Sequence, residues 1–244
     1  MDAKIRLYAR NQLCKAQIIS LERNQANYLF AVMRQAVGSQ ILIFNNCDGE
    51  WLAEIIDGNK RFVKLKCLSE IRPSMVPPNV WLFFSPIKKS RTDFIVEKAT
   101  ELGVAEIFPT HSEFTNSERI NQARLQAHAI EAAEQCGGTY VPKVHQICKL
   151  TDTLQEWPND REIFFCNEDN LKPTRKLSEL PNGAWAIFVG PEGGYSKKEK
   201  DRFMKHPKTF SMSLGPRILR ADTAVISALT LWQSHYGDWN GNDI

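Results

Sequence analysis

The chain has 244 residues, 43% of them hydrophobic and 24% charged, with a formal net charge of +3 at pH 7. This composition suits one or two folded domains, and no window approaches the roughly eighteen continuous apolar residues of a membrane span. The first residues contain no apolar stretch of signal-peptide length, so we expect a cytoplasmic protein. Six scattered cysteines form no C-x-x-C pair, which argues against a structural zinc site and a disulfide framework.

The positive charge is concentrated near the N-terminus. Residues 1–79 contain 11 Lys and Arg against 7 Asp and Glu, whereas residues 80–244 contain 20 against 21. A basic N-terminal third is typical of a module that docks onto nucleic acid, although a surplus of this size also suits an ordinary solvated surface.

Short β-like segments dominate the first 72 residues. Turn sequences rich in Gly, Asn and Asp separate them, and one helix is expected around residues 25–34. The five expected strands are Arg6–Tyr8, Gln17–Ile19, Gln40–Phe44, Glu50–Ile56 and Phe62–Leu68. This spacing predicts a small β-barrel. A proline-rich linker at residues 73–79 follows, because no helix or central strand tolerates three prolines there.

Strands then alternate with longer helical segments over residues 80–244. The expected strands are Val80–Ser85, Ala105–Pro109, Glu162–Cys166, Ala184–Val189 and Thr209–Leu214, and the expected helices are Thr92–Leu102, Glu118–Cys136, one after Ser196, and Thr223–His235. Such alternation predicts an α/β domain with a parallel sheet.

Two Gly-Pro turns mark a ligand site near the C-terminus. The first, Gly190 to Gly194, follows an apolar strand and precedes Ser196 and Glu199, which fit a capping box at a helix start. The second, Leu214 to Arg220, ends another strand-like segment. Glycines at such turns allow a ligand to approach bare backbone, so the two turns suggest one site with two walls.

The common nucleotide-binding patterns are absent. A Rossmann domain needs G-x-G-x-x-G after its first strand, but residues 86–91 contain no glycine. No G-x-x-x-x-G-K-[ST] sequence occurs, which excludes a P-loop. The five histidines lack metal-ligand spacing, so we expect structural roles for them and no metal.

Four motifs, in this order and spacing, resemble the 16S ribosomal RNA (uracil-N3) methyltransferase family of the SPOUT superfamily. They are Glu97 to Val104, Glu134 to Gly137, Gly190 to Gly194 and Leu214 to Arg220. The resemblance runs nearly end to end, because residues 1–70 look like the family's PUA-like RNA-binding barrel. It implies domains at residues 1–72 and 80–244, the second with a deep trefoil knot, and a homodimer formed through this SPOUT domain.

The resemblance also implies S-adenosylmethionine as cofactor, held by three loops in the knot. The cofactor-binding residues carried over to this chain are Cys166, Asn167, Val189, Gly190, Glu192, Gly194, Leu214, Gly215, Ile218 and Leu219. An apolar slot would hold the adenine, and the glycines would let backbone groups reach its edge. Glu192 has a second interpretation, as a partner of the following helix dipole.

Methylation at uracil N3 requires removal of a proton and stabilisation of the resulting anion. Arg220 and Arg217 follow the second Gly-Pro turn and are the candidates for charge stabilisation, while Asp222 could orient an arginine or accept the proton. Arg217 could equally anchor a phosphate or carboxylate. Asp222 could instead be the N-cap of the last helix.

The RNA partner would be 16S ribosomal RNA or the small ribosomal subunit. The candidate RNA-binding residues are Arg6, Arg10, Arg34, Lys88, Lys89 and Arg91, although a solvated loop is the alternative for the last three. Phe114 and Gly138 stand where the family usually has arginine, and Asp222 where many relatives have glutamate. Two other functions stay open: methylation of another RNA position such as a ribose 2′-hydroxyl, and a non-catalytic role in ribosome assembly.

Overall fold

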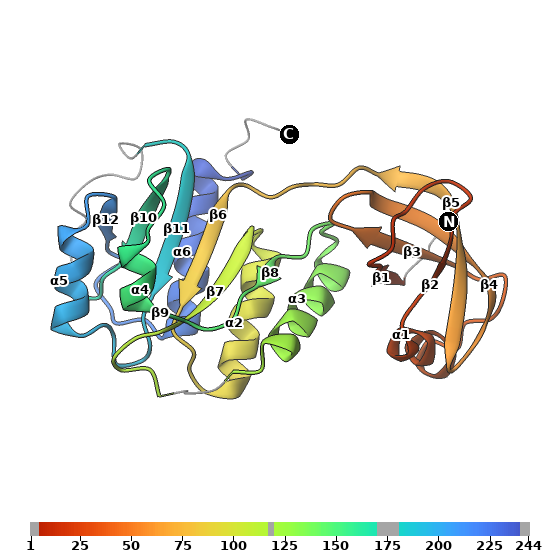
Figure 1. The fold of residues 1–244 in the computed structure, drawn as a ribbon, viewed down its shortest axis with the longest axis horizontal. Helices are drawn as coiled ribbons and strands as arrows, with labels where there is room; N and C mark the ends of the chain where they lie inside the picture. Colours follow the sequence, from red (N-terminus) through yellow and green to blue (C-terminus); the bar gives the residue numbers. More distant parts are fainter. Residues whose placement is uncertain (1–4, 117–119, 170–180, 240–244) are drawn as a thin grey trace. The chain divides into compact units, whose positions relative to one another are not determined.

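The computed structural model describes residues 5–116, 120–169 and 181–239, which form two compact units (Figure 1). The N-terminal unit contains residues 1–76 and 133–141, and the C-terminal unit contains residues 77–132 and 142–244. The main boundary thus falls inside the proline-rich segment. Nothing in the composition indicates that residues 133–141 belong to the N-terminal unit. None of the helices in the three described ranges has the length and apolarity that a membrane span requires.

A five-stranded mixed sheet forms the N-terminal unit. Its strands are β1 (Arg6–Tyr8), β2 (Ile18–Ser20), β3 (Gln40–Asn45), β4 (Gly49–Asn59) and β5 (Phe62–Arg72). The order is β1-β3-β4-β5-β2, and β1 runs parallel to β3 while the other neighbours are antiparallel. Because β1 and β2 do not pair within the described residues, the expected barrel is an open mixed sheet. The expected helix is short, α1 (Arg23–Asn27), and continues into the π-helical turn η1 (Tyr28–Val32).

Strand alternation builds the core of this unit. In β5, Val63, Leu65 and Cys67 are fully buried, and the lysines between them are exposed. Successive side chains of a strand point to opposite faces, so one face packs inward and the other carries positive charge. Gly49 begins β4 with a φ of +74°, and a Cβ there would lie 2.3 Å from the Arg72 carbonyl oxygen. Only glycine fits this approach.

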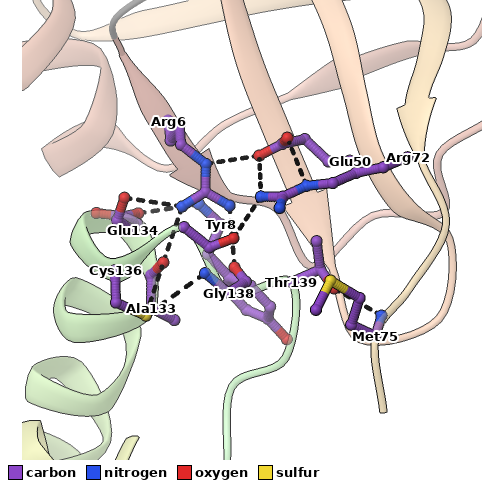
Figure 2. Close-up of polar contacts among 11 residues, drawn as sticks. Arg6, Tyr8, Glu50, Arg72, Met75, Ala133, Glu134, Cys136, Gly138 and Thr139 are labelled. Atoms are coloured by element: carbon purple, nitrogen blue, oxygen red, sulfur yellow. Dashed lines mark hydrogen bonds and ion pairs between the residues drawn. The ribbon is translucent and has the colours of Figure 1, made fainter. Parts of the chain in front are cut away.

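A buried carboxylate holds the second segment of the N-terminal unit. Glu50, only 3% exposed, accepts hydrogen bonds from Arg6 Nε at 2.6 Å and Arg72 Nε at 2.9 Å, as Figure 2 shows. Arg6 also donates to the carbonyl oxygens of Ala133, Glu134 and Gly138, each at 2.9 Å. The carbonyls of Ala133 and Glu134 belong to the last turn of a helix. Carbonyl groups in a last turn have no intrahelical hydrogen-bond partner, and they carry the partial negative charge of the helix dipole.

This geometry corrects the expectation for Arg6. Its guanidinium donates four hydrogen bonds inside the unit and its side chain is 13% exposed, so it has little left to offer a phosphate. Arg6 is therefore a structural residue. Arg10 and Arg34 are exposed, and Arg10 makes an open ion pair with Glu22 at 3.7 Å.

A seven-stranded parallel sheet forms the C-terminal unit. Its strands are β6 (Val80–Phe84), β7 (Glu106–His111), β8 (Lys143–Val144), β9 (Cys148–Lys149), β10 (Arg161–Cys166), β11 (Ala184–Val189) and β12 (Thr209–Met212). The order is β12-β10-β11-β6-β7-β8, with β9 paired to β7, and every pair is parallel. The helices are α2 (Lys89–Glu101), α3 (Gln122–Cys136), α4 (Leu150–Gln155), α5 (Lys197–Lys205) and α6 (Ala221–Tyr236). The predicted α/β fold with a parallel sheet is confirmed.

Helices cover both faces of this sheet. Leu150 and Leu154 of α4 and Phe203 of α5 pack in one cluster with strand residues such as Phe165 and Phe188. The helix α6 lies behind the sheet in Figure 1 and contacts β11 and α2. Because strand β11 is covered on both faces, Trp185 to Val189 are all buried, as its continuous apolar sequence indicates.

The sequence missed three short elements, β8, β9 and α4, because two-residue strands and a six-residue helix have no readable periodicity. The helix α2 begins at Lys89 rather than Thr92, and β12 ends at Met212, which leaves Leu214 in a loop. The expected start of α3 at residue 118 lies outside the described residues. Arg220, not Asp222, is the N-cap of α6, so the N-cap interpretation of Asp222 is wrong.

Candidate active site

The candidate site lies at the carboxyl ends of three neighbouring strands. Strands β12, β10 and β11 are adjacent and parallel, with Cys166 opposite Met212 and Phe165 opposite Phe188. The loops that follow them therefore leave the same edge of the sheet. In open α/β sheets the crevice beyond the carboxyl ends of the strands is the usual ligand site.

These loops and the start of α6 enclose a cavity of about 220 Å³, called here the loop pocket. It is lined by Cys166, Asn167, Glu168, Val189, Gly190, Pro191, Glu192, Gly193, Gly194, Leu214, Gly215, Arg217, Ile218, Leu219, Ala221 and Ala224. The set includes all ten residues expected to bind the cofactor. The sequence analysis did not predict that Ala221 and Ala224 line this pocket. Their spacing of three residues at the start of a helix, with small side chains, was the pattern that could have indicated it.

Glycine is required in the wall formed by the β11–α5 loop. Gly194 has a φ of +69°, and a Cβ there would lie 2.1 Å from Glu168 Oε1. At Gly190 a Cβ would lie 3.1 Å from the Tyr195 ring. The loop therefore approaches Glu168 of the β10 loop only because Gly194 lacks a side chain, while Gly190 leaves room for the Tyr195 ring of the same loop.

Buried hydrogen bonds hold the wall in place. Ser196 and Glu199 form the expected capping box of α5, with the Ser196 backbone N–H donating to Glu199 Oε2 at 2.9 Å. The other carboxylate oxygen of Glu199 accepts from the Glu113 backbone N–H at 2.8 Å. Glu199 is 5% exposed. One buried side chain thus fixes the start of α5 and the loop after β7 together, a role the sequence did not reveal.

The thiol of Cys166, in the lining of the loop pocket, is uncharged at neutral pH. Cys166 is 8% exposed, and burial, with a further contribution from the Glu168 charge, raises the pKa of its thiol far above the usual range. The thiol therefore stays protonated and neutral, and we exclude it as a base or nucleophile.

Arg91 connects three elements at the rim. From the first turn of α2 its Nη1 donates to Glu192 Oε1 at 3.0 Å, and its Nε lies 3.7 Å from Asp222 Oδ2 of α6. The expected phosphate contact of Arg91 is thus replaced, in this structure, by two carboxylate partners. The alternative in which Asp222 orients an arginine matches this contact.

A second cavity of about 420 Å³, called here the arginine hollow, adjoins the loop pocket. It is lined by Lys88, Arg91, Glu192, Ile218, Leu219 and Arg220, and three of these residues also line the loop pocket. Arg217 lines the loop pocket and Arg220 the hollow, so the two candidate catalytic arginines lie in adjoining spaces. Both side chains are exposed, and neither pairs with any residue in the described part of the chain.

Comparison with known proteins identifies the class. A family model described as an RNA methyltransferase domain matches residues 74–233, and one described as an RNA methyltransferase PUA domain matches residues 21–68. The ribosomal RNA small subunit methyltransferase E of Rickettsia conorii is 29% identical over 228 residues, which cover 92% of this chain and 93% of that protein.

Two solved structures resemble the whole chain. The ribosomal RNA small subunit methyltransferase E from Neisseria gonorrhoeae, bound to S-adenosyl methionine, has a TM-score of 0.84 at 27% identity, with 96% of this chain and 99% of that chain covered. A methyltransferase from Legionella pneumophila, in complex with the same cofactor, has a TM-score of 0.86 at 28% identity, with 96% and 98% covered.

Fold and comparisons together define a two-part RNA methyltransferase, with an N-terminal PUA domain and a C-terminal parallel-sheet domain. The chain belongs to the 16S ribosomal RNA (uracil-N3) methyltransferase family of the SPOUT superfamily, as its four motifs indicated.

Proposed function

We propose that this protein methylates N3 of a specific uridine in 16S ribosomal RNA, with S-adenosylmethionine as the methyl donor. The observation that carries the proposal is the loop pocket with the arginine hollow against it. The first offers bare backbone and apolar surface to a cofactor, and the second offers unpaired cations beside it. The family and the two relatives bound to the cofactor support this assignment.

The residues of the loop pocket fit S-adenosylmethionine. Leu214, Leu219 and Ala224 provide an apolar slot for the adenine, and the glycine-bearing loops present backbone donors and acceptors to its edge. The carboxylates of Glu168 and Glu192 face the same space and suit the cofactor's cationic groups. When bound, the cofactor supplies an electrophilic methyl group on a sulfonium centre.

The arginine hollow would receive the target base. Loss of the N3 proton leaves an anion spread over N3 and the neighbouring carbonyl oxygens, and the unpaired guanidinium of Arg220 can stabilise this charge. Arg217, on the loop-pocket side, can serve the same charge or hold a phosphate. Asp222 and Glu192 are the candidate proton acceptors, and Arg91 positions both carboxylates.

Partners and topology extend the proposal. Lys88 and Lys89 at the start of α2, and Arg10 and Arg34 in the N-terminal unit, are the proposed phosphate contacts, since their side chains are exposed. We also infer that the C-terminal unit forms the family's trefoil knot and that the protein acts as a homodimer through this domain. Both inferences rest on the family membership.

Two measurements test the proposal. Titration calorimetry should show uptake of S-adenosylmethionine, whereas a purely RNA-binding assembly factor would show none. Mass mapping of small-subunit RNA from a deletion strain should then show one missing N3-methyluridine, restored by the purified protein. Restoration of a ribose 2′-O-methyl group would establish the alternative target.

A further inference from the structure

A third cavity adjoins the loop pocket and the arginine hollow. This side groove has a volume of about 300 Å³ and is lined by Pro86, Ile87, Lys88, Lys89, Asn116, Pro191 and Glu192. It shares Pro191 and Glu192 with the loop pocket, and Lys88 and Glu192 with the arginine hollow. A molecule in the side groove would therefore lie next to the other two cavities.

Phe114 lies near the side groove without being part of its lining, and 46% of its surface is exposed. It lies two residues before Asn116 of the groove and packs on the backbone of Gly193, where a Cβ would come within 3.5 Å of the Phe114 Cβ and 3.8 Å of its ring. Exposed aromatic rings beside a polar cavity are suitable platforms for stacking.

The loop that carries Phe114 is held rigidly. The Ser112 hydroxyl bonds the hydroxyls of Ser85 at 2.9 Å and Thr115 at 2.8 Å, and all three side chains are buried. At the next residue of the loop, the Glu113 backbone N–H donates to the buried carboxylate of Glu199 on α5. The ring is thus positioned before any ligand arrives, which lowers the entropic cost of binding to it.

The charges of the side groove favour an anionic occupant. Lys88 and Lys89 pair with no acid in the described ranges, whereas the one carboxylate of the lining, Glu192, is paired with Arg91 at 3.0 Å. The Asn116 side chain adds an amide that can donate and accept hydrogen bonds. Cations for a phosphate, an amide for a base edge and an aromatic face together match one nucleotide of a single strand.

We propose that the side groove binds the nucleotide next to the target uridine in the RNA strand. Its base stacks on Phe114, and its phosphate lies against Lys88 and Lys89. The groove thus selects the neighbour of the target while the arginine hollow receives the target itself. This inference rests on the proposed function, because it requires an RNA substrate at the adjoining site.

Steady-state methylation of the deletion-strain RNA substrate, with Phe114→Ala, Phe114→Leu and Phe114→Trp compared, tests the stacking. Phe114→Ala should raise KM for RNA about 10-fold, as expected for the loss of one stacked base, with kcat and cofactor affinity unchanged. Phe114→Trp should retain the wild-type KM and Phe114→Leu should not. The matched control is Phe94→Ala, which removes a phenylalanine of similar exposure (37%) on α2 outside the three cavities and should change nothing.

The second arm locates the base. RNAs with a single abasic position on either side of the target should show one position whose removal raises KM in the wild type but not in Phe114→Ala. A Leu variant as good as wild type, or Phe114→Ala kinetics equal to those of Phe94→Ala, would overturn the proposal. A loss in Phe114→Ala that couples to no abasic position would mean that the ring contacts a protein and would overturn it as well. Absence of methylation by the wild type would instead refute the proposed function.

Discussion

Two charged clusters in this molecule have opposite arrangements. In the N-terminal unit a carboxylate, Glu50, lies between two guanidinium groups with its side chain 4% exposed. At the rim of the candidate site a guanidinium, Arg91, lies between the carboxylates of Glu192 and Asp222, which are 48% and 18% exposed. The first cluster also satisfies backbone carbonyls, whereas Glu192 of the second cluster lines all three cavities.

The difference in solvation separates a structural cluster from a functional one. Removing one member of a buried pair leaves an uncompensated charge, so the Glu50 cluster should control stability. Exposed ion pairs contribute little to folding, so the geometry around Arg91 should matter mainly for what it positions. Each of the following predictions tests one side of this contrast.

The largest effect is expected from Glu50→Gln. It leaves Arg6, 13% exposed, without its counter-charge in a largely buried site, whereas Arg72, 36% exposed, keeps part of its hydration, so the expected cost is about 3 kcal/mol of unfolding free energy. Urea unfolding followed by circular dichroism measures the loss. Glu54→Gln on the same strand, where no ion pair is present in the described structure, should change stability by less than about 0.5 kcal/mol. Equal losses in the two variants would contradict the structural role of the Glu50 cluster.

Arg220→Ala should lower kcat by about 10²–10³-fold, because it removes a cation aimed at the developing charge on the base. Its unfolding free energy should stay close to wild type, since this exposed side chain has no partner in the described chain. Arg202→Ala, which removes an exposed arginine from α5, is the control and should retain full activity. A wild-type kcat for Arg220→Ala would remove Arg220 from the reaction.

Arg91→Gln should lower kcat/KM about 10–100-fold, because two carboxylates lose the group that positions them. Arg124→Gln is matched in exposure, 27% against 26%, and breaks an ion pair with Asp93 away from the cavities. If the two variants have the same kinetics, the positioning role of Arg91 is refuted. Arg91→Lys should recover part of the activity, since lysine keeps the charge but cannot reach both partners in the same geometry.

Gly194→Ala should weaken S-adenosylmethionine binding about 10-fold, because the added Cβ displaces the Glu168 carboxylate from the pocket wall. Gly38→Ala separates this collision from backbone strain. Gly38 has a φ of +90° with open space around it, so it should lose comparable stability, about 1 kcal/mol, without any change in cofactor binding. Titration calorimetry of both variants with S-adenosylmethionine measures the difference. Equal cofactor affinities in the two variants would show that the contact between the added Cβ and Glu168 does not affect cofactor binding.

The sequence predicted much of this architecture for physical reasons. Apolar alternation in β5 and the continuous apolar run of β11 reflect one-sided and two-sided burial, so both strands were readable. The capping box at Ser196 is a local pattern and was also readable. The glycine turns indicated a ligand site, because left-handed backbone at Gly194 and Gly215 requires glycine.

Other features depend on contacts between distant residues, and they escaped prediction. Arg6 looked like a free surface cation because its partners, Glu50 and the carbonyls of residues 133–138, are separated from it by at least 44 positions. Arg91 looked like a phosphate contact for the same reason, since Glu192 lies 101 positions away. An isolated sequence shows the charge of a side chain, but only the fold shows its partner.

The central claim is that the protein methylates N3 of a uridine, with the cofactor in the loop pocket and the target base in the arginine hollow. The most direct test incubates the purified protein and S-adenosylmethionine with small-subunit RNA from a deletion strain and maps the modified nucleosides by mass spectrometry. We predict one N3-methyluridine per RNA, strongly reduced with Arg220→Ala and with Gly194→Ala at low cofactor concentration. Formation of a 2′-O-methyl nucleoside, or of no methylated nucleoside by the wild-type protein, would contradict the claim.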